Sequence, residues 1–494
     1  MAAESHTVGE ILRRHAVSRG AHPLLVCDAD RLSYSDADHR SARLARGLVA
    51  LGAGKGTHVG VLYPNGAEFV VAMLAAARIG AVVIPFTTFA TATELRRQLV
   101  HSDIAILLAT AFYRGNDFRA RVADIDKTAL PLLRHVLIDT EPAESVDEAL
   151  LDAMESDVDG SDPLAIIYTS GSTGAPKGVV HTHAALLGHQ ENLNAVRGLT
   201  ADDRLFCNSP FFWVGGFAFG LLATLVAGST LVCSNAIDAG ETLDLLEAER
   251  PTVTNGFVAG IAHLARHPSI GTRDLSSMRR GNLYPIMAPD VRPADPELRH
   301  NMLGLTEAGG VVLLSGDETD QPEHRRGSFG RPAPGFETAV DEQGELCIRG
   351  PYLMQRYYKR SREESFDADG WFHTGDLVRT DADRFFYFIG RRGSMIKTAG
   401  VNVSPAEVET AIVRVSGGAT AYVFGIPDSE RGQAVVAVIA TEDPFDESAL
   451  RHELKRDLSA YKVPKRIVAV APSRIPLLSS GKVDMNRLAA VFDA

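Results

Sequence analysis

The sequence predicts an α/β fold with a large N-terminal region and a small C-terminal domain. Short Val- and Ile-rich runs at 58–64 and 81–86 predict buried strands, and Ala-rich helical patterns follow them at 66–79 and from Glu94. Strands that alternate with helices in this way are typical of a parallel sheet covered by helices. The apolar run at 164–169 predicts another buried strand.

The pattern changes in the last third of the chain. Short strands and turns take over from Gly344, and a compact segment follows Gly390. In that segment, helical patterns lie at 405–415 and 447–459, and strand patterns at 420–426 and 434–440. We therefore expect an N-terminal domain at 1–390, a hinge at 391–393 and a C-terminal domain at 394–494, which has a common domain size.

Charge and cysteine usage exclude several classes of protein. The 494 residues include 50 Lys and Arg against 62 Asp and Glu, so the formal net charge is −12. A net-acidic chain without a long basic run argues against binding to nucleic acid or to an anionic membrane surface. The spacing of Cys27, Cys207, Cys233 and Cys347 suggests neither a zinc site nor a disulfide framework, and we expect a cytoplasmic protein.

No segment of the sequence predicts membrane insertion or secretion. Residues 1–20 carry scattered charges where a signal peptide needs an apolar run. The stretch between Arg204 and Asp238 has no charged residue, but Pro and Gly interrupt it repeatedly. It therefore predicts a buried strand, loop, helix and strand, and not a transmembrane helix.

A loop rich in hydroxyl groups and glycine directly follows the strand at 164–169. Backbone amides and hydroxyls in such a loop can surround phosphate oxygens, and a lysine adds positive charge. The candidate phosphate-binding residues are Thr169, Ser170, Gly171, Ser172, Thr173, Gly174 and Lys177. The loop is not a Walker A motif, because Pro176 and Gly178 flank the lysine. The alternative interpretation is a flexible surface loop.

The segment YTSGSTGAPKGV at 168–179 resembles the signature of the adenylate-forming superfamily, which includes acyl-CoA synthetases, peptide-synthetase adenylation domains and beetle luciferases. Further motifs similar to those of the family follow in order: Leu303-Gly304-Leu305-Thr306-Glu307, Trp371-Phe372-His373-Thr374-Gly375-Asp376, Gly390-Arg391 with Ile396-Lys397, and Pro476-Leu477-Leu478-Ser479-Ser480-Gly481-Lys482. The resemblance covers nearly the whole chain. It implies packed N-terminal sheets with a β-barrel-like subdomain, and a mobile α+β C-terminal lid.

The resemblance also implies the chemistry. A carboxylate is a poor electrophile, and attachment of AMP converts it into a mixed anhydride that a thiol can attack. The expected cofactors are ATP or AMP, Mg²⁺ and coenzyme A. Thr306 would contact phosphate, Glu307 would ligate magnesium, Asp376 would accept the ribose hydroxyls, and Arg391 would add a ribose or phosphate contact. Taken without the motif, Glu307 is also consistent with an acid near a helix start.

The lid would contribute three more residues by the same resemblance. Lys482 is the expected catalytic cation at the phosphate, and Lys397 and Gly400 would line the pantetheine tunnel. Lys482 alone would be interpreted as a surface lysine. Its assignment depends on the motif around it.

Aromatic and small residues are expected to form the acyl pocket, and this mixture suits an apolar acid. The candidates are Phe212, Trp213, Gly216, Phe217, Asn255, Gly256, Phe257, Leu303 and Gly304. Core packing is the alternative for the three phenylalanines. No carboxylate lies in the run 211–214, which argues against an α-amino acid substrate.

Three departures from the family pattern concern the nucleotide site and the hinge. Leu303 replaces the usual Tyr that stacks on adenine, and the segment before it is short and contains Tyr284 as a substitute ring. Gly393 replaces the usual polar hinge residue.

We therefore expect an acyl-CoA ligase that works through an acyl-adenylate. One alternative is an enzyme that performs thioester formation only, on an acyl-adenylate supplied by a partner enzyme. Further alternatives are a ligase that loads a free carrier protein and a catalytically idle ligand-binding paralogue.

Overall fold

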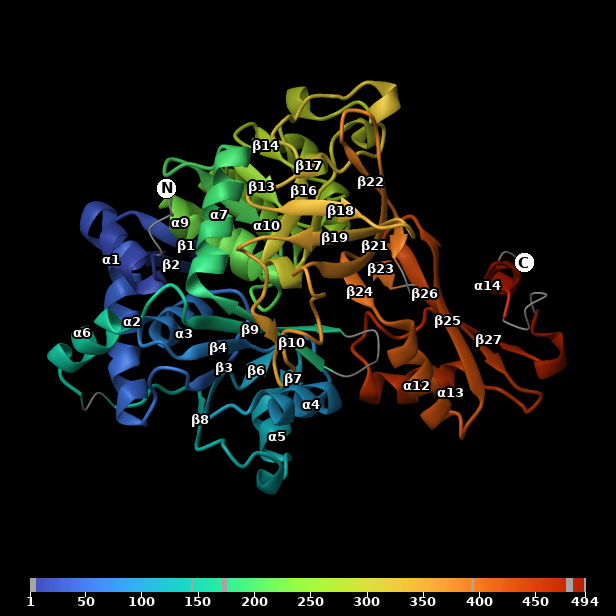
Figure 1. The fold of residues 1–494 in the computed structure, drawn as a ribbon, viewed down its shortest axis with the longest axis horizontal. Helices are drawn as coiled ribbons and strands as arrows, with labels where there is room; N and C mark the ends of the chain where they lie inside the picture. Colours follow the sequence, from blue (N-terminus) through green and yellow to red (C-terminus); the bar gives the residue numbers. More distant parts are fainter. Residues whose placement is uncertain (1–5, 144–145, 171–175, 392–394, 477–482, 493–494) are drawn as a thin grey trace. The chain divides into compact units, whose positions relative to one another are not determined.

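The computed structural model describes residues 6–143, 146–170, 176–391, 395–476 and 483–492. The chain forms two units, drawn in Figure 1. The larger unit contains Met1–Thr88, Leu99–Thr169 and Gly178–Gly390, and the smaller contains Phe89–Gln98, Ser170–Lys177 and Arg391–Ala494.

Two mostly parallel sheets form the frame of the larger unit. The six-stranded sheet has the order β14 (Arg280–Gly281), β13 (Val253–Asn255), β11 (Arg204–Cys207), β12 (Thr230–Cys233), β1 (Pro23–Cys27) and β2 (Asp30–Ser33). The seven-stranded sheet has the order β20 (Arg356–Tyr357), β10 (Pro176–Thr182), β9 (Pro163–Ser170), β4 (Val82–Pro85), β3 (His58–Leu62), β5 (Ile106–Ala109) and β8 (His135–Ile138). Only β2 and β20 pair antiparallel with their neighbours among the pairings described.

The predicted strand-helix alternation is confirmed in the seven-stranded sheet. β3 and β4 pair in parallel, and α3 (Ala67–Arg78) connects them. Almost every side chain of α3 is buried, because the helix packs into a core to which both large sheets contribute. The helix predicted from Glu94 is α4 (Ala92–Ser102).

Further helices cover these sheets or connect their strands. They are α1 (Val8–Arg19), α2 (Tyr34–Ala50), α5 (Phe118–Ala123), α6 (Glu148–Ser156), α7 (His183–Arg197), α10 (Ala239–Glu249) and α11 (Ala262–Ala265). α1 and α2 both begin with a capping box, in which the N-cap hydroxyl and the third helical residue satisfy each other's backbone N–H. A two-stranded ribbon, β6 (Phe112–Tyr113) with β7 (Asn116–Asp117), precedes α5.

The uncharged stretch after Arg204 folds as expected, into a strand, a loop, a helical segment and a strand. The helical part consists of α8 (Val214–Gly216), the π-helix η2 (Phe217–Leu222) and α9 (Ala223–Ala227). Within the described part of the chain, no helix has the length and apolar run needed to span a membrane.

Two small antiparallel sheets complete the larger unit and share one hydrophobic core. One has the order β15 (Leu303–Leu305), β16 (Gly310–Leu314) and β17 (Arg331–Pro332). The other has the order β18 (Glu337–Val340), β19 (Glu345–Arg349), β21 (Phe372–Thr380) and β22 (Phe386–Arg391). The short strands predicted after Gly344 include three strands of the second sheet, β19, β21 and β22.

The smaller unit is built on a five-stranded sheet. Its order is β24 (Val401–Val403), β23 (Ile396–Thr398), β26 (Gly432–Ala440) and β25 (Thr420–Asp428), and β27 (Arg466–Val470) also pairs with β26. The predicted helices are present as α12 (Pro405–Val415) and α13 (Glu447–Asp457), and α14 (Met485–Ala489) lies near the C-terminus.

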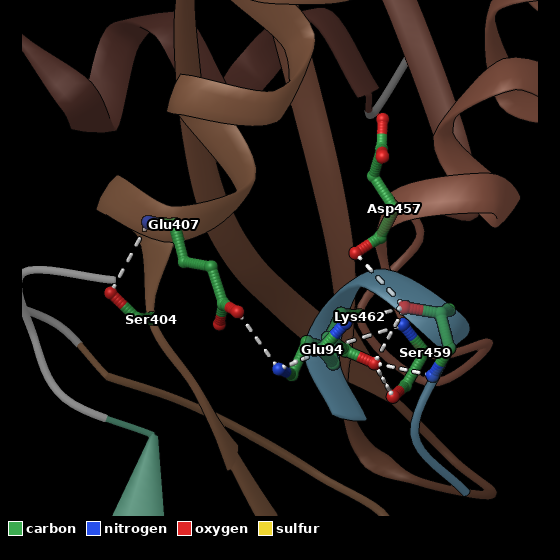
Figure 2. A network of polar contacts seen from close by, with 7 residues as sticks. Glu94, Ser404, Glu407, Asp457, Ser459 and Lys462 are labelled. Carbon is green, nitrogen blue, oxygen red and sulfur yellow. Dashed lines mark hydrogen bonds and ion pairs between the residues drawn. The ribbon is translucent and has the colours of Figure 1, made fainter. Parts of the chain in front are cut away.

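An ion-pair network joins an early segment of the chain to the smaller unit's own helices. Lys462 Nζ lies 2.7 Å from Glu94 Oε1 and 2.9 Å from Glu407 Oε1. The Ser459 hydroxyl also donates to Glu94 (Figure 2). Glu94 and Lys462 are buried and Glu407 is half-buried, and the smaller unit includes the first turns of α4 as an integral part.

Candidate active site

Two strands of the seven-stranded sheet border the predicted phosphate loop. β9 ends at Ser170, and β10 begins at Pro176. Thr169 and Lys177 are half-buried at the two ends of the loop. The predicted residues Gly171, Ser172, Thr173 and Gly174 lie outside the described residues.

The side of the loop near Gly178 is tightly packed. A Cβ atom at Gly178 would lie only 2.7 Å from Ile166 Cγ2 and 3.3 Å from Tyr168 Cζ. The Tyr168 hydroxyl lies 2.8 Å from His101 Nδ1, which anchors the ring. Glycine at 178 therefore permits β10 to run directly beside the strand that leads into the loop.

Thr306 and Glu307 lie together on the short helix η8 (Thr306–Ala308), which follows β15. His181 Nε2 donates to the Thr306 carbonyl oxygen at 2.7 Å. Burial lowers the pKa of His181 to about 4, so this imidazole is neutral and acts as a fixed donor.

The Glu307 carboxylate is oriented by a tyrosine. The Tyr357 hydroxyl donates to Glu307 Oε1 at 2.6 Å, and the Met354 N–H donates to the Glu307 carbonyl oxygen at 2.8 Å. The carboxylate is half-buried, and a hard oxygen ligand of this kind fits Mg²⁺.

Asp376 is held within the four-stranded sheet. It lies on β21 and is only 3% exposed. Its N–H donates to Thr374 Oγ1 at 3.0 Å, and the Thr374 hydroxyl donates to the Leu346 carbonyl oxygen at 2.7 Å. This arrangement fixes the backbone around the carboxylate.

The carboxyl ends of β11 and β13 bring part of the predicted acyl pocket together. Cys207 and Asn255 are register partners, so Asn208 and Gly256 follow them side by side. Asn208 Oδ1 accepts from the Phe257 N–H at 3.0 Å, and Asn208 Nδ2 donates to the Phe257 carbonyl at 3.0 Å. Open α/β sheets commonly bind ligands at this edge.

The predicted aromatic residues divide into two groups. Phe212 and Trp213 make an edge contact at 5.5 Å between centroids, and Trp213 makes another with Phe257 at 6.2 Å. Phe217, in contrast, is fully buried and lies 6.4 Å from Phe69 in the main core. Gly216 packs so closely on the loop before it that a Cβ would lie 2.1 Å from the Pro210 carbonyl oxygen.

Leu303 and Gly304 lie on β15, and their side-chain positions face opposite ways. Leu303 is buried in the core of the two small sheets, and Gly304 is exposed. Tyr284, the substitute ring, packs against a different core cluster and has the Arg299 guanidinium above it.

In the smaller unit, the structure describes only some of the predicted residues. Lys397 lies exposed on β23, and its N–H donates to Gln433 Oε1 at 2.8 Å. Gly400 is exposed in the following turn with φ +82°. Arg391 is the last residue of β22, whereas Gly393 and Lys482 lie outside the described residues.

Sequence reasoning missed the residues that orient these groups. They are His181, Tyr357, Asn208 and Asn282, whose Nδ2 donates to the Gly256 carbonyl at 2.8 Å. A polar residue at the end of a buried strand is the only signal that Asn208 gives, and no local pattern marks the other three.

Comparison with known proteins identifies the class of enzyme. Residues 12–358 match the family model described as AMP-binding enzyme, and residues 407–482 match the AMP-binding enzyme C-terminal domain. The chain therefore belongs to the AMP-binding enzyme family, and its resemblance to adenylate-forming enzymes is confirmed.

The chain is also similar to individual proteins over nearly its whole length. It is 31% identical to a 3-[(3aS,4S,7aS)-7a-methyl-1,5-dioxo-octahydro-1H-inden-4-yl]propanoyl:CoA ligase of Mycobacterium tuberculosis, over 99% of both chains. It is 32% identical to a feruloyl-CoA synthase of an Amycolatopsis species, over 92% of both.

Solved structures share its fold. The amide bond synthetase McbA of Marinactinospora thermotolerans has a TM-score of 0.80 at 24% identity, covering 99% of this chain and 100% of that one. A fatty acyl CoA synthetase of Mycobacterium tuberculosis has a TM-score of 0.67 at 25% identity, covering 98% of both. These likenesses confirm the predicted mixed α/β fold with a large N-terminal and a small C-terminal domain.

Proposed function

We propose that this protein is an acyl-CoA ligase that activates an apolar carboxylic acid as its adenylate and then transfers the acyl group to coenzyme A. In the first step the carboxylate attacks the α-phosphorus of ATP and pyrophosphate leaves. In the second, the thiol of coenzyme A attacks the acyl carbon, and AMP leaves. The thiol proton passes to solvent or to the departing phosphate.

The observation that carries the proposal is the pair Thr306 and Glu307 at the end of β15. Two neighbours that the sequence did not predict hold this pair in place. His181 donates to the Thr306 carbonyl oxygen, and the Tyr357 hydroxyl donates to the Glu307 carboxylate. A carboxylate fixed in this way would hold a magnesium ion. When bound, that ion supplies charge neutralisation at the phosphates.

The remaining predicted residues have complementary roles in the proposal. Asp376 accepts the ribose hydroxyls, and Arg391 contacts ribose or phosphate. Lys482 stabilises the charge that develops at the α-phosphate. Lys397 and Gly400 line the path of pantetheine after a swing of the C-terminal domain about residues 391–393.

The pocket residues support an apolar acid with a ring system. Edge contacts join Phe212 to Trp213 and Trp213 to Phe257. The nearby Asn208 amide oxygen already accepts a hydrogen bond from the Phe257 N–H. The names of two relatives refer to a feruloyl group and to a bicyclic propanoyl group, and both of these acyl groups contain rings. We propose free acid, ATP and coenzyme A as the small-molecule partners, and the cytoplasm as the location.

A second candidate is thioester formation alone, on an acyl-adenylate supplied by another enzyme. Leu303 favours it, because this position lacks an aromatic ring for adenine and its side chain is buried in the core. Loss of one stacking contact costs roughly 1–3 kcal/mol, which weakens nucleotide binding without abolishing it. We therefore keep the complete ligase as the proposal.

The test is acid-dependent exchange of pyrophosphate into ATP by the purified protein. We expect exchange with the wild type, and a loss on the order of 100-fold in Glu307→Gln, because a magnesium ligand is removed while its shape is kept. Glu323→Gln, at the exposed start of another short helix, is the matched control and should exchange like the wild type. Equal exchange in both variants would contradict the role of Glu307, and no exchange with any acid would favour the second candidate.

A further inference from the structure

A cluster of metal-ligating side chains lies on the four-stranded sheet of the larger unit. Asp341 follows β18 in the turn to β19, Cys347 lies on β19 and His373 lies on β21. Their ligand atoms all lie within 4.8 Å of one another. Along β21, His373 is exposed and Asp376 is buried, as expected for side chains on opposite faces of a strand. The cluster is therefore separate from the proposed nucleotide site.

The strand pairing sets the spacing between sulfur and nitrogen. Cys347 and His373 are direct cross-strand partners, and Cys347 Sγ lies 3.4 Å from His373 Nδ1. In a tetrahedral zinc site with Zn–S of about 2.3 Å and Zn–N of about 2.0–2.1 Å, sulfur and nitrogen lie about 3.5 Å apart. The observed spacing lies within hydrogen-bond range for this pair and also matches that of two ligands of one ion.

The other ring nitrogen of His373 faces a carboxylate. His373 Nε2 lies 3.5 Å from Asp367 Oδ2. Asp367 is itself held by the N–H groups of Trp371 at 2.8 Å and Asp369 at 3.0 Å. Metal-binding histidines usually donate their second N–H to such a carboxylate, which fixes the tautomer. A proton on Nε2, the nitrogen that faces Asp367, would leave Nδ1, the nitrogen beside Cys347, available to a metal.

The surroundings of the thiol are negatively charged. Glu345 Oε2 lies 3.7 Å from His373 Nδ1, so the carboxylates of Glu345 and Asp367 lie beside the cluster and add to the charge of Asp341 within it. Negative charge around a site favours a cation bound within it.

We propose that Asp341, Cys347 and His373 form a binding site for a divalent cation of the zinc class. Thiolate and imidazole ligands select zinc-like ions, whereas Mg²⁺ prefers oxygen ligands such as Glu307. As the metal–sulfur bond forms, the thiol loses its proton to solvent. The oxidation states of the sulfur and of the metal do not change. The ion crosslinks β19, β21 and the turn before β19, on the face opposite Asp376.

The experiment is a Cd²⁺ titration of the metal-free full-length protein in excess Mg²⁺, followed by the ultraviolet absorbance of the thiolate-to-metal band. We expect the band to saturate at one equivalent of Cd²⁺ and to be absent in Cys347→Ser. Excess Zn²⁺ should displace Cd²⁺ and remove the band. Isolated surface histidines cannot give this band, because it requires a thiolate.

A pair of matched variants tests the carboxylate. Asp341 Oδ1 accepts from the N–H groups of Gln343 and Glu345 in its turn, and Asp381 accepts from those of Asp383 and Phe385 in the same way. Asparagine keeps the Oδ1 acceptor of both turns, so we expect Asp341→Asn and Asp381→Asn to fold, although Asp381 also accepts from the Tyr387 hydroxyl through Oδ2. We expect only Asp341→Asn to weaken Cd²⁺ binding, by more than about tenfold.

Three results would overturn the proposal. They are absence of the band at one equivalent, a band that persists in Cys347→Ser, and equal Cd²⁺ affinity in the two Asp→Asn variants. The second result would assign the thiolate to the other buried cysteines.

Discussion

Gly256, beside Phe257 of the candidate acyl pocket, has a backbone conformation that residues other than glycine rarely adopt. Its φ is +149°, and a Cβ atom there would lie 1.7 Å from Asn208 Oδ1. Asn208 in turn binds both backbone polar groups of Phe257. A side chain at 256 would therefore both strain the backbone and displace the asparagine that holds one aromatic residue of the pocket.

Gly256→Ala should destabilise the larger unit and reduce activity with every acid. Backbone strain alone costs about 1–3 kcal/mol, and the overlap with Asn208 adds to it. Gly271→Ala is the control, because a Cβ there meets no atom within 4 Å and its φ is not positive. Thermal unfolding of the two variants checks this, and equal melting temperatures would contradict the account of Gly256.

Trp213→Ala should raise KM for ring-bearing acids by about tenfold, because aromatic contacts contribute about 0.5–1.5 kcal/mol beyond the buried area. KM for ATP is the internal control and should not change. Steady-state kinetics with acid and ATP varied separately provide the measurement. A parallel rise in both KM values would mean that Trp213 stabilises the fold and does not contact the acid.

Among the structural elements, the start of α4 depends on a buried charge network. Burial works to raise the pKa of Glu94, but the Lys462 charge and hydrogen bonds from Lys462, Ser459 and Thr91 outweigh it and lower that pKa. A carboxylate whose pKa is lower in the folded state stabilises the fold above its ordinary pKa of about 4.3. This stabilisation is lost as the pH falls through the folded-state value.

Glu94→Gln should therefore destabilise the smaller unit by roughly 3 kcal/mol at neutral pH, and by less in acid, where wild-type Glu94 is protonated. Faster hydrogen exchange of the β26 amides, measured at both pH values, is the readout. Glu453→Gln removes an exposed ion pair with Arg456 in the same unit and should change exchange little. A Glu94→Gln effect that is the same at both pH values would contradict a role for the charge.

Elements with a local period were predictable from the sequence, and long-range polar clusters were not. The pattern at 58–86 predicted β3, α3 and β4, because burial on both faces of a parallel strand leaves a run of apolar residues. Glu94 and Lys462 lie 368 residues apart, and nothing local marks either as a partner. Cysteine spacing also gave no sign of the Cys347 cluster, because its other ligands are an Asp and a His brought in by strand pairing.

At the scale of the whole molecule, each of the two units contains segments that are not contiguous in the sequence. In the structure, residues 89–98 group with Arg391–Ala494, although the two segments lie far apart in the sequence. The local pattern of residue types along a sequence predicts secondary structure, but it does not predict which distant segments pack together. For the same reason, the motif residues could be predicted from resemblance, while His181, Tyr357 and Asn208, which orient them, could not.

We propose that this one chain performs both adenylation and thioester formation. The most direct measurement is mass spectrometry of acyl-CoA after incubation of the protein with Mg²⁺, coenzyme A, ATP and a panel of apolar acids, including ferulate and bicyclic propanoates. A parallel sample receives preformed acyl-adenylates without ATP. We predict the same thioester in both samples, with one AMP released for each thioester formed. Thioester from the preformed adenylates alone, with none from acid and ATP, would contradict the claim.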